Sequence, residues 1–175
     1  VMKFENRLYI RLQPWSEDGI VSKLDVGIGD KLLNYYDFSS TQNYLSKGKN
    51  VVRNSVYLYA GAQGQLKKFM KWDAAGKYTF LGAEVNDFDV TANLNFNIFP
   101  FRKARNSPLS FNARFETSLK EPDWYQQHYL SNHYKWDNSF GKISETKIEA
   151  SAAVPHWKLK ASFGYALLSN NIYYD

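Results

Sequence analysis

The stretch "DVTANLNFNIF" (Asp89–Phe99) alternates between polar and apolar residues almost without interruption. Apolar residues occupy the even positions from Val90 to Ile98, and polar residues occupy the odd positions from Asp89 to Asn97. Successive side chains of a β-strand point to opposite faces of a sheet, so this period of two predicts a strand with one apolar and one polar face. The alternation does not say which face meets water.

The same period recurs along the chain, in "SFNARFETSL" (110–119), "KIEASAAV" (147–154) and "WKLKASFGYAL" (157–167). No window has the 3.6-residue period of an amphipathic helix. The sequence is therefore predicted to be all-β. The predicted strands span residues 2–12, 20–33, 53–63, 71–85, 88–99, 108–120, 142–154 and 157–169.

The connections between these strands differ in length in an ordered way. The first, third, fifth and seventh fall at one end of an up-and-down sheet, and all four are short. The two long ones, 34–52 and 121–141, fall at the other end and are rich in Tyr, Asn and Ser. Short turns at one end and long loops at the other are typical of outer-membrane β-barrels. The ten residues from Val90 to Phe99 also match the roughly 9–11 that a tilted strand needs to cross the hydrocarbon.

Composition narrows the classes of protein further. Among the 175 residues there are 13 Tyr, 12 Phe and 5 Trp, and Trp and Tyr favour membrane–water boundaries. The absence of Cys excludes disulfides and thiolate metal sites. The net charge of +5 is scattered except for "RKAR" (102–105), so a nucleic-acid partner is not expected. The mean hydropathy of −0.51 remains compatible with a membrane barrel, whose strands need apolar residues only at every second position.

The membrane interpretation predicts what surrounds each face of the sheet. In a transmembrane barrel the apolar row meets lipid and the polar row lines a wet interior, whereas a soluble barrel reverses the arrangement. The predicted lumen-lining residues are Arg7, Arg11, Asp73, Lys77, Asn93, Asn95, Asn97, Arg114, Glu116, Lys147, Glu149, Lys158 and Lys160. The predicted lipid-facing residues are Val90, Leu94, Phe96, Ile98, Phe111, Phe115, Ile148, Val154, Leu159 and Phe163.

Three segments carry a resemblance to a known family. They are "KWDAAGKYTFLGAEVNDFDVTANLNF" (71–96), "SPLSFNARFETSLKEPDWYQQHYLSNHYKWDNSF" (107–140) and "PHWKLKASFGYALLSNNIYYD" (155–175). With these spaced aromatics and turns, the chain from about Val56 to Asp175 resembles the β-barrel porins of Bacteroidota outer membranes. The resemblance implies an outer-membrane barrel with more strands than this chain contains, and it brings no catalytic motif.

Topology supplies a separate expectation about completeness. If the short turns are periplasmic, Val1 and Asp175 both lie at the extracellular end, whereas complete bacterial barrels start and finish on the periplasmic side. We therefore expect residues 1–175 to be part of a single outer-membrane barrel domain, incomplete at both ends.

Catalytic and metal chemistry finds little support in the sequence. His128 and His133 share a long loop with Asp123 and Asp137, but their spacing matches no zinc motif. "RKAR" is interpreted as a basic periplasmic turn, although it also fits an acidic partner or lipid phosphate. No enzyme activity, metal or cofactor is expected.

Three functions follow from these observations. The first is a porin of the cell outer membrane that lets small solutes diffuse passively. The second is a non-conducting barrel subunit of an outer-membrane complex, which binds other envelope proteins through its long loops. The third is a soluble β-barrel that binds a ligand. For the first two, the expected surroundings are outer-membrane lipid and lipopolysaccharide.

Overall fold

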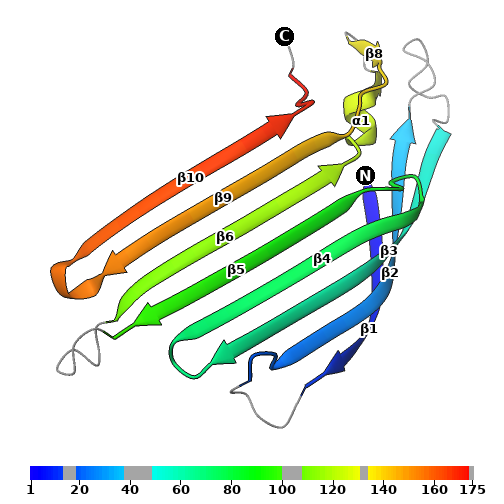
Figure 1. Cartoon of the computed structure of the whole chain (residues 1–175). Helices are drawn as coiled ribbons and strands as arrows, with labels where there is room; N and C mark the ends of the chain where they lie inside the picture. Colours follow the sequence, from blue (N-terminus) through cyan, green and yellow to red (C-terminus); the bar gives the residue numbers. More distant parts are fainter. Residues whose placement is uncertain (14–18, 38–48, 100–107, 131–133, 174–175) are drawn as a thin grey trace.

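The computed structural model of the chain describes residues 1–13, 19–37, 49–99, 108–130 and 134–173. Within these ranges the chain is almost entirely β-structure (Figure 1). The strands are β1 (Met2–Leu12), β2 (Lys23–Asp37), β3 (Lys49–Leu66), β4 (Met70–Gly82), β5 (Phe88–Ile98), β6 (Leu109–Lys120), β7 (His128–Leu130), β8 (Lys135–Asp137), β9 (Ile143–Val154) and β10 (Leu159–Ser169). The helical elements are a short α-helix, α1 (Trp124–Gln127), and the 3-10 helix η1 (Pro155–Trp157).

Eight of the strands form one antiparallel sheet in the order β1-β2-β3-β4-β5-β6-β9-β10. Each strand pairs with its neighbours along the chain, and β7 and β8 form a separate two-stranded sheet within the connection between β6 and β9. The predicted all-β, antiparallel, up-and-down class is confirmed, and each of the eight predicted strands corresponds to one strand of the sheet. Among the described residues the sheet is open, because β1 pairs only with β2 and β10 only with β9.

The register preserves the alternation across most of the sheet, with a β-bulge between β3 and β4 at Val56 and Tyr57. Asn93 lies opposite Asp73 on one side and Arg114 on the other, while the adjacent Ala92 lies opposite Ala74 and Phe115. Polar positions therefore meet polar positions and apolar positions meet apolar ones from strand to strand. A slip of one residue would exchange the faces of a strand, so the continuity of both faces fixes the register.

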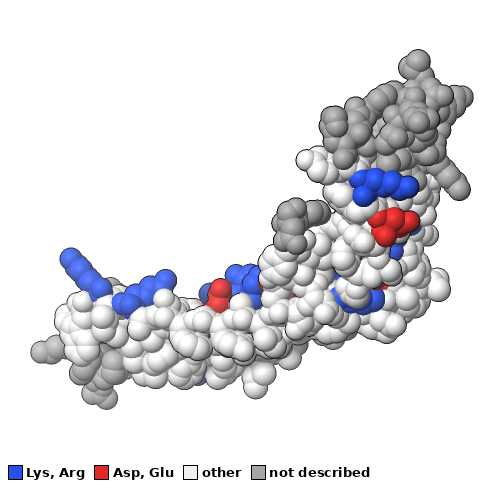
Figure 2. All heavy atoms as spheres, turned by 90° about the horizontal axis from the view of Figure 1, so that it is seen from above, with Lys and Arg blue, Asp and Glu red and all other residues white. Residues whose placement is uncertain are grey.

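The sheet is strongly curved: β2 and β3 run beside β4 near the short turns and bend sharply away from the direction of β5, β6, β9 and β10 toward the long-loop end (Figure 1), and the bend is also seen from above (Figure 2). We call the side that carries Tyr57, Lys77 and Arg114 the concave face, and the side that carries Leu94 and Phe115 the convex face. Figure 2 shows the Lys, Arg, Asp and Glu side chains gathered along the hollow of this bend.

Glycines of β2 make room for rings at the bend. A Cβ atom at Gly29 would overlap the Tyr57 ring, and one at Gly27 would overlap the Cβ of Tyr9. Glycines within strands commonly mark such close approaches and sharp bends. The missing side chains therefore let the tyrosines of neighbouring strands cover β2 on the concave face.

The buried residues of the described chain are few and mainly polar. Only Leu33, Tyr35 and Tyr57 are buried hydrophobic residues. The buried polar residues are Asp25, Ser55, Thr79, Asp87, Ser118 and Gln127. This distribution is the reverse of a soluble sandwich, in which apolar faces form the core.

Several connections differ from the sequence expectation, and two of the differences have a clear structural cause. The turn between β4 and β5 spans residues 83–87 rather than Asn86 and Asp87 alone, because β4 ends at Gly82 in a positive-φ conformation (φ +101°). At Gly82 a Cβ would overlap the carbonyl oxygen of Asn54, so a larger residue would not fit. The connection from β9 to β10 includes η1 and Lys158, so the last strand begins at Leu159 instead of residue 157.

Candidate functional site

The concave face collects the charges of the sheet. With the exception of Asp30, every described charged side chain of the eight sheet strands belongs to the set of alternate positions that faces this side. The register brings opposite charges into neighbouring strands, as for Arg114 opposite Glu149 and Glu116 opposite Lys147. The concave face is therefore a mixed, ion-paired surface and not a field of one sign.

A cluster around Tyr57 fills the bend. The Tyr57 hydroxyl donates a hydrogen bond to Glu5 Oε1 at 2.7 Å and accepts one from Arg7 Nε at 3.3 Å. The Lys77 ammonium lies 3.8 Å from the centroid of the Tyr57 ring, and Glu5 also pairs with Lys3 at 2.8 Å. Tyr57 is 0% exposed, so its ring and hydroxyl join β1, β3 and β4 at the most curved part of the sheet.

Further ion pairs tie the connections to the strands. Lys31 of β2 donates to Glu84 of the β4–β5 turn, with Nζ and Oε1 2.6 Å apart. Arg11 of β1 binds Asp25 of β2 through two hydrogen bonds of 2.7 and 3.0 Å. The Lys31 and Glu84 side chains are only 16% and 14% exposed, so removal of either one would leave the other as a largely buried, unpaired charge.

The β6–β9 connection closes over the long-loop end of the concave face. Asp123 caps α1: its carboxylate accepts a hydrogen bond from the backbone N–H of Tyr125 at 2.9 Å, and its own backbone N–H donates to Gln126 Oε1. The second carboxylate oxygen of Asp123 accepts the hydroxyl of Tyr35 at 3.1 Å. The Tyr125 hydroxyl reaches the backbone of Tyr36, where it donates to the carbonyl oxygen at 2.8 Å. These hydrogen bonds from Tyr35 and to Tyr36 hold the loop against β2.

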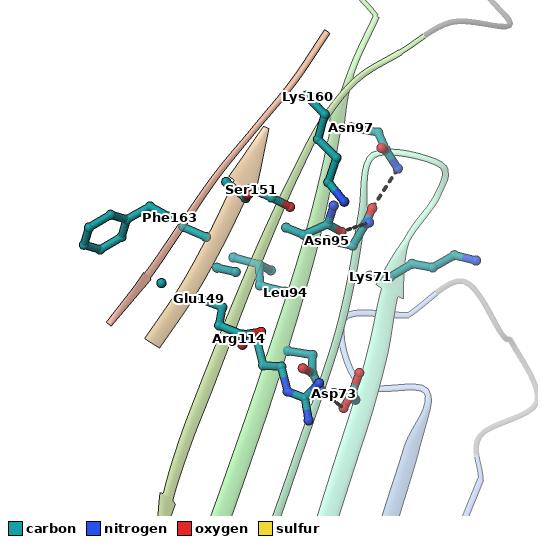
Figure 3. Close-up of a pocket in the computed structure, with 16 residues that line it drawn as sticks. Lys71, Asp73, Leu94, Asn95, Asn97, Arg114, Glu149, Ser151, Lys160 and Phe163 are labelled. Atoms are coloured by element: carbon teal, nitrogen blue, oxygen red, sulfur yellow. Dashed lines mark hydrogen bonds between the residues drawn. The ribbon is translucent and has the colours of Figure 1, made fainter. Parts of the chain in front are cut away.

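A polar recess occupies the short-turn end of the concave face (Figure 3). It has a volume of about 870 Å³, and side chains of β4, β5, β6, β9 and β10 line it. Its floor carries a ladder of amides and hydroxyls: Ser110 donates to Asn97 at 2.7 Å, Asn97 to Asn95 at 3.0 Å, and Asn95 to Asn112. A floor with this many donors and acceptors favours water or a polar solute over an apolar one.

The convex face is apolar and exposed. Leu94 is 43% exposed, Phe115 38% and Phe163 67%, although all three lie within strands. The soluble-barrel hypothesis requires Leu94 and Phe96 to be buried, but both are exposed. Soluble proteins seldom leave so large a contiguous apolar surface uncovered, so the convex face needs an apolar environment.

The structure separates the two sets of residues proposed from the sequence. The register places the following on the concave face: Arg7, Arg11, Asp73, Lys77, Asn93, Asn95, Asn97, Arg114, Glu116, Lys147, Glu149 and Lys160. It places the following on the convex face: Val90, Leu94, Phe96, Ile98, Phe111, Phe115, Ile148, Val154, Leu159 and Phe163. That the faces meet a lumen and lipid, respectively, stays a prediction.

Lys158 differs from its expected placement within a strand. It lies in the turn after η1, with φ +52°, and not in β10. Pro155 starts the 3-10 turn, and the Lys158 N–H donates to the Pro155 carbonyl oxygen at 3.0 Å. This turn needs one residue in the left-handed conformation, and Lys158 provides it.

Sequence reasoning missed the cluster around Tyr57. Alternation alone does not distinguish this tyrosine from its exposed neighbours, because it reports the face and not the curvature. One available signal was the spacing of Gly27 and Gly29, two residues apart on the face that later receives the Tyr9 and Tyr57 rings.

The loop histidine has an ordinary partner. His128 Nδ1 lies 2.6 Å from Asp137 Oδ1, which closes the small β7–β8 hairpin. His133 and the "RKAR" segment fall outside the described residues. Within the described ranges, no three His, Asp or Glu side chains approach closely enough to hold a metal ion. The same ranges contain no helix that is long and apolar enough to cross a membrane.

Comparison with known proteins gives one match, to a protein family. No curated protein and no solved structure matches the chain significantly. The model of a family described as "Putative porin" matches residues 1–175, the whole length of the sequence. With an apolar convex face and a charged concave one, the eight-stranded sheet has the architecture that such a family implies. The chain belongs to the porin family that this model describes.

Proposed function

We propose that the chain forms part of an outer-membrane β-barrel whose concave face lines a water-filled lumen, through which small solutes diffuse passively. Family membership supports a porin-like role in the outer membrane. A transport role of this kind needs no catalytic group, and the concave face offers a polar, ion-paired wall suited to hydrated solutes.

The separation of the two faces carries the proposal. In water, Leu94, Phe115 and Phe163 would be expected inside, and the Tyr57 cluster outside. The opposite holds here, and a lipid-facing convex surface accounts for it because acyl chains replace the protein core as the apolar medium. The surrounding molecules in this proposal are outer-membrane lipid and lipopolysaccharide.

The open edges of the sheet add a requirement. The free edges of β1 and β10 present unpaired backbone groups, and such groups cannot remain in hydrocarbon because each costs several kcal/mol. Figure 1 shows the two edges on opposite sides of the sheet. The proposal therefore includes closure of the barrel by strands beyond these eight.

The test is conductance of the full-length protein in planar bilayers, together with swelling of vesicles in solutions of sugars of increasing size. The proposal predicts steady channel currents and a size cutoff for sugar entry. A folded, bilayer-inserted protein with no conductance and no swelling would refute it, and would favour a non-conducting subunit that binds a partner through its long loops.

A further inference from the structure

The cations of the concave face are not distributed like its carboxylates. Between described residues, all ten ion pairs lie outside the two rows of side chains nearest the short turns. One of these rows runs Lys71, Asn95, Asn112, Ser151 and Ser162 across five strands. The other runs Asn97, Ser110, Ala153 and Lys160. Neither row contains a carboxylate, so together they carry two positive charges and no negative one.

Both lysines line the recess, and neither forms an ion pair with a described residue. In Figure 3 the Lys160 side chain extends over the floor toward Asn95 and Asn97, whereas the Lys71 side chain extends from β4 at the opposite margin, away from the other labelled residues. Lys160 therefore stands as a cation above a hydrogen-bonding floor, and Lys71 adds to the positive potential from the far side.

The floor has donors left over. The ladder uses one proton of the Asn95 amide and one of the Asn97 amide, and each amide nitrogen carries two. The Asn112 Nδ2 makes no hydrogen bond with the described part of the chain, because Asn112 serves only as an acceptor there. Ammonium and amide donors that converge on one space match the oxygens of a carboxylate or phosphate.

The nearest carboxylates leave this arrangement intact. Asp73 and Glu149 also line the recess, one row farther from the turns than Lys71, and Arg114 lines it in the same row. Asp73 accepts a hydrogen bond from Asn93 at 2.8 Å, and Glu149 lies opposite Arg114 in the register. The lining of the recess keeps a net positive charge, because it contains three cations (Lys71, Arg114 and Lys160) against these two carboxylates. No carboxylate shares a row with Lys71 or Lys160.

We propose that this recess is a binding site for small anions that carry a carboxylate or phosphate. Binding at this site would give the pore a preference for anionic solutes. The inference rests on the proposed function, since it names the class of solute that the same face would pass. The ligand is a free solute and not a lipid headgroup, because the recess opens on the face opposite the apolar one.

The test uses the full-length protein in planar bilayers with KCl, and inorganic phosphate as the probe. In the wild-type protein, phosphate should reduce the chloride current with a saturable concentration dependence. The double variant Lys71→Gln/Lys160→Gln should raise the half-blocking phosphate concentration roughly tenfold, the factor expected for loss of two solvent-exposed charge contacts.

The matched control is the double variant Lys67→Gln/Lys158→Gln. It removes the same charge at the same end of the sheet, but both lysines lie in turns outside the recess. Its half-blocking concentration should stay within about twofold of wild type, because neither lysine lines the recess and exposed charges outside a site contribute little. Equal effects of the two double variants, or no phosphate block in a conducting wild-type protein, would overturn the inference and leave the proposed function standing.

Calorimetric titration of phosphate into the detergent-solubilised protein tests the anion site separately from the proposed pore function. If the protein does not conduct, the proposed function fails, but binding that is weakened in Lys71→Gln/Lys160→Gln alone would still establish the anion site. A single substitution, Asn112→Asp, keeps the size of the side chain and places a negative charge on the floor of the recess. It should abolish phosphate block, and unchanged block in that variant would contradict the site.

Discussion

The hydroxyl of Tyr57 offers a sharp perturbation of the bend. Tyr57→Phe keeps the buried ring and its contact with the Lys77 ammonium, but removes the donor to Glu5 Oε1 and the acceptor for Arg7 Nε. The bond to Glu5 is short and charge-assisted, and bonds of this class contribute about 1.5–3 kcal/mol. The bond from Arg7, at 3.3 Å, is long and adds little.

The lower end of that range applies, because Glu5 keeps its ion pair with Lys3 after the substitution. We therefore expect Tyr57→Phe to lower the free energy of unfolding by about 1.5 kcal/mol. The assay is guanidinium unfolding of the protein in lipid vesicles, followed by tryptophan fluorescence. Tyr59→Phe is the matched control, since Tyr59 lies two residues along the same strand and face and its hydroxyl makes no hydrogen bond with the described chain. A Tyr57→Phe effect no larger than that of Tyr59→Phe would refute the buried network.

Three further substitutions test other parts of the structure. Leu94→Arg places a charge near the middle of β5 on the convex face and should lower the free energy of unfolding in vesicles by about 2–4 kcal/mol. The control Asn95→Arg, on the concave face, should lower it by less than about 1 kcal/mol. Similar losses for the two variants in unfolding titrations would count against a lipid-facing Leu94. Gly29→Ala introduces a methyl group that overlaps the buried tyrosine ring and should cost about 1–3 kcal/mol, while Gly76→Ala, whose methyl would meet only ordinary contacts, should be nearly neutral; equal melting temperatures would contradict the crowding. Asp123→Ala removes the cap of α1 and should lower the local stability of the helix by about 1 kcal/mol. Limited proteolysis should then cleave the connection between β6 and β9 faster. An unchanged cleavage rate would contradict the role of Asp123 in holding this connection against β2.

The sequence predicts the sheet well because one physical signal dominates it. Strict alternation, as in β5, determines both the strand and the partition of its side chains, and pairing in register extends that partition to the neighbouring strands. The eight predicted strands consequently correspond in order to the eight strands of the large sheet, with bounds that differ by a few residues, whereas β7 and β8 were not predicted. Fold class and the two faces were therefore available before any coordinates.

The curvature and its consequences were not available in the same way. The position of Tyr57 depends on side chains of β1, β2 and β4 that meet only when the sheet bends, and no local period reports a bend. The short helix α1 interrupts a polar loop, where its capping box, Asp123 to Gln126, is the only local signal. Lys158 was misplaced because a turn residue in the left-handed conformation continues the alternation of β10 by coincidence.

The anion recess combines both kinds of information. Three of its asparagines were recognised from the sequence as the polar face of one strand, but the absence of carboxylates from the two rows nearest the turns required the register of five strands. Charge counted along the chain would give a mixed surface, and only the pairing reveals that no carboxylate shares a row with Lys71 or Lys160.

The claim that the convex face lies in lipid is open to a direct measurement, because the chain contains no cysteine. Single cysteines introduced in turn at positions 89 to 98 of the full-length protein can each carry a nitroxide in lipid vesicles. Collision rates are then measured with oxygen, which concentrates in lipid, and with a water-soluble nickel complex. Oxygen collisions should peak at the even positions, including Leu94→Cys, and nickel collisions at the odd positions, including Asn95→Cys. The reverse phase, or collision rates with no alternation, would contradict the account.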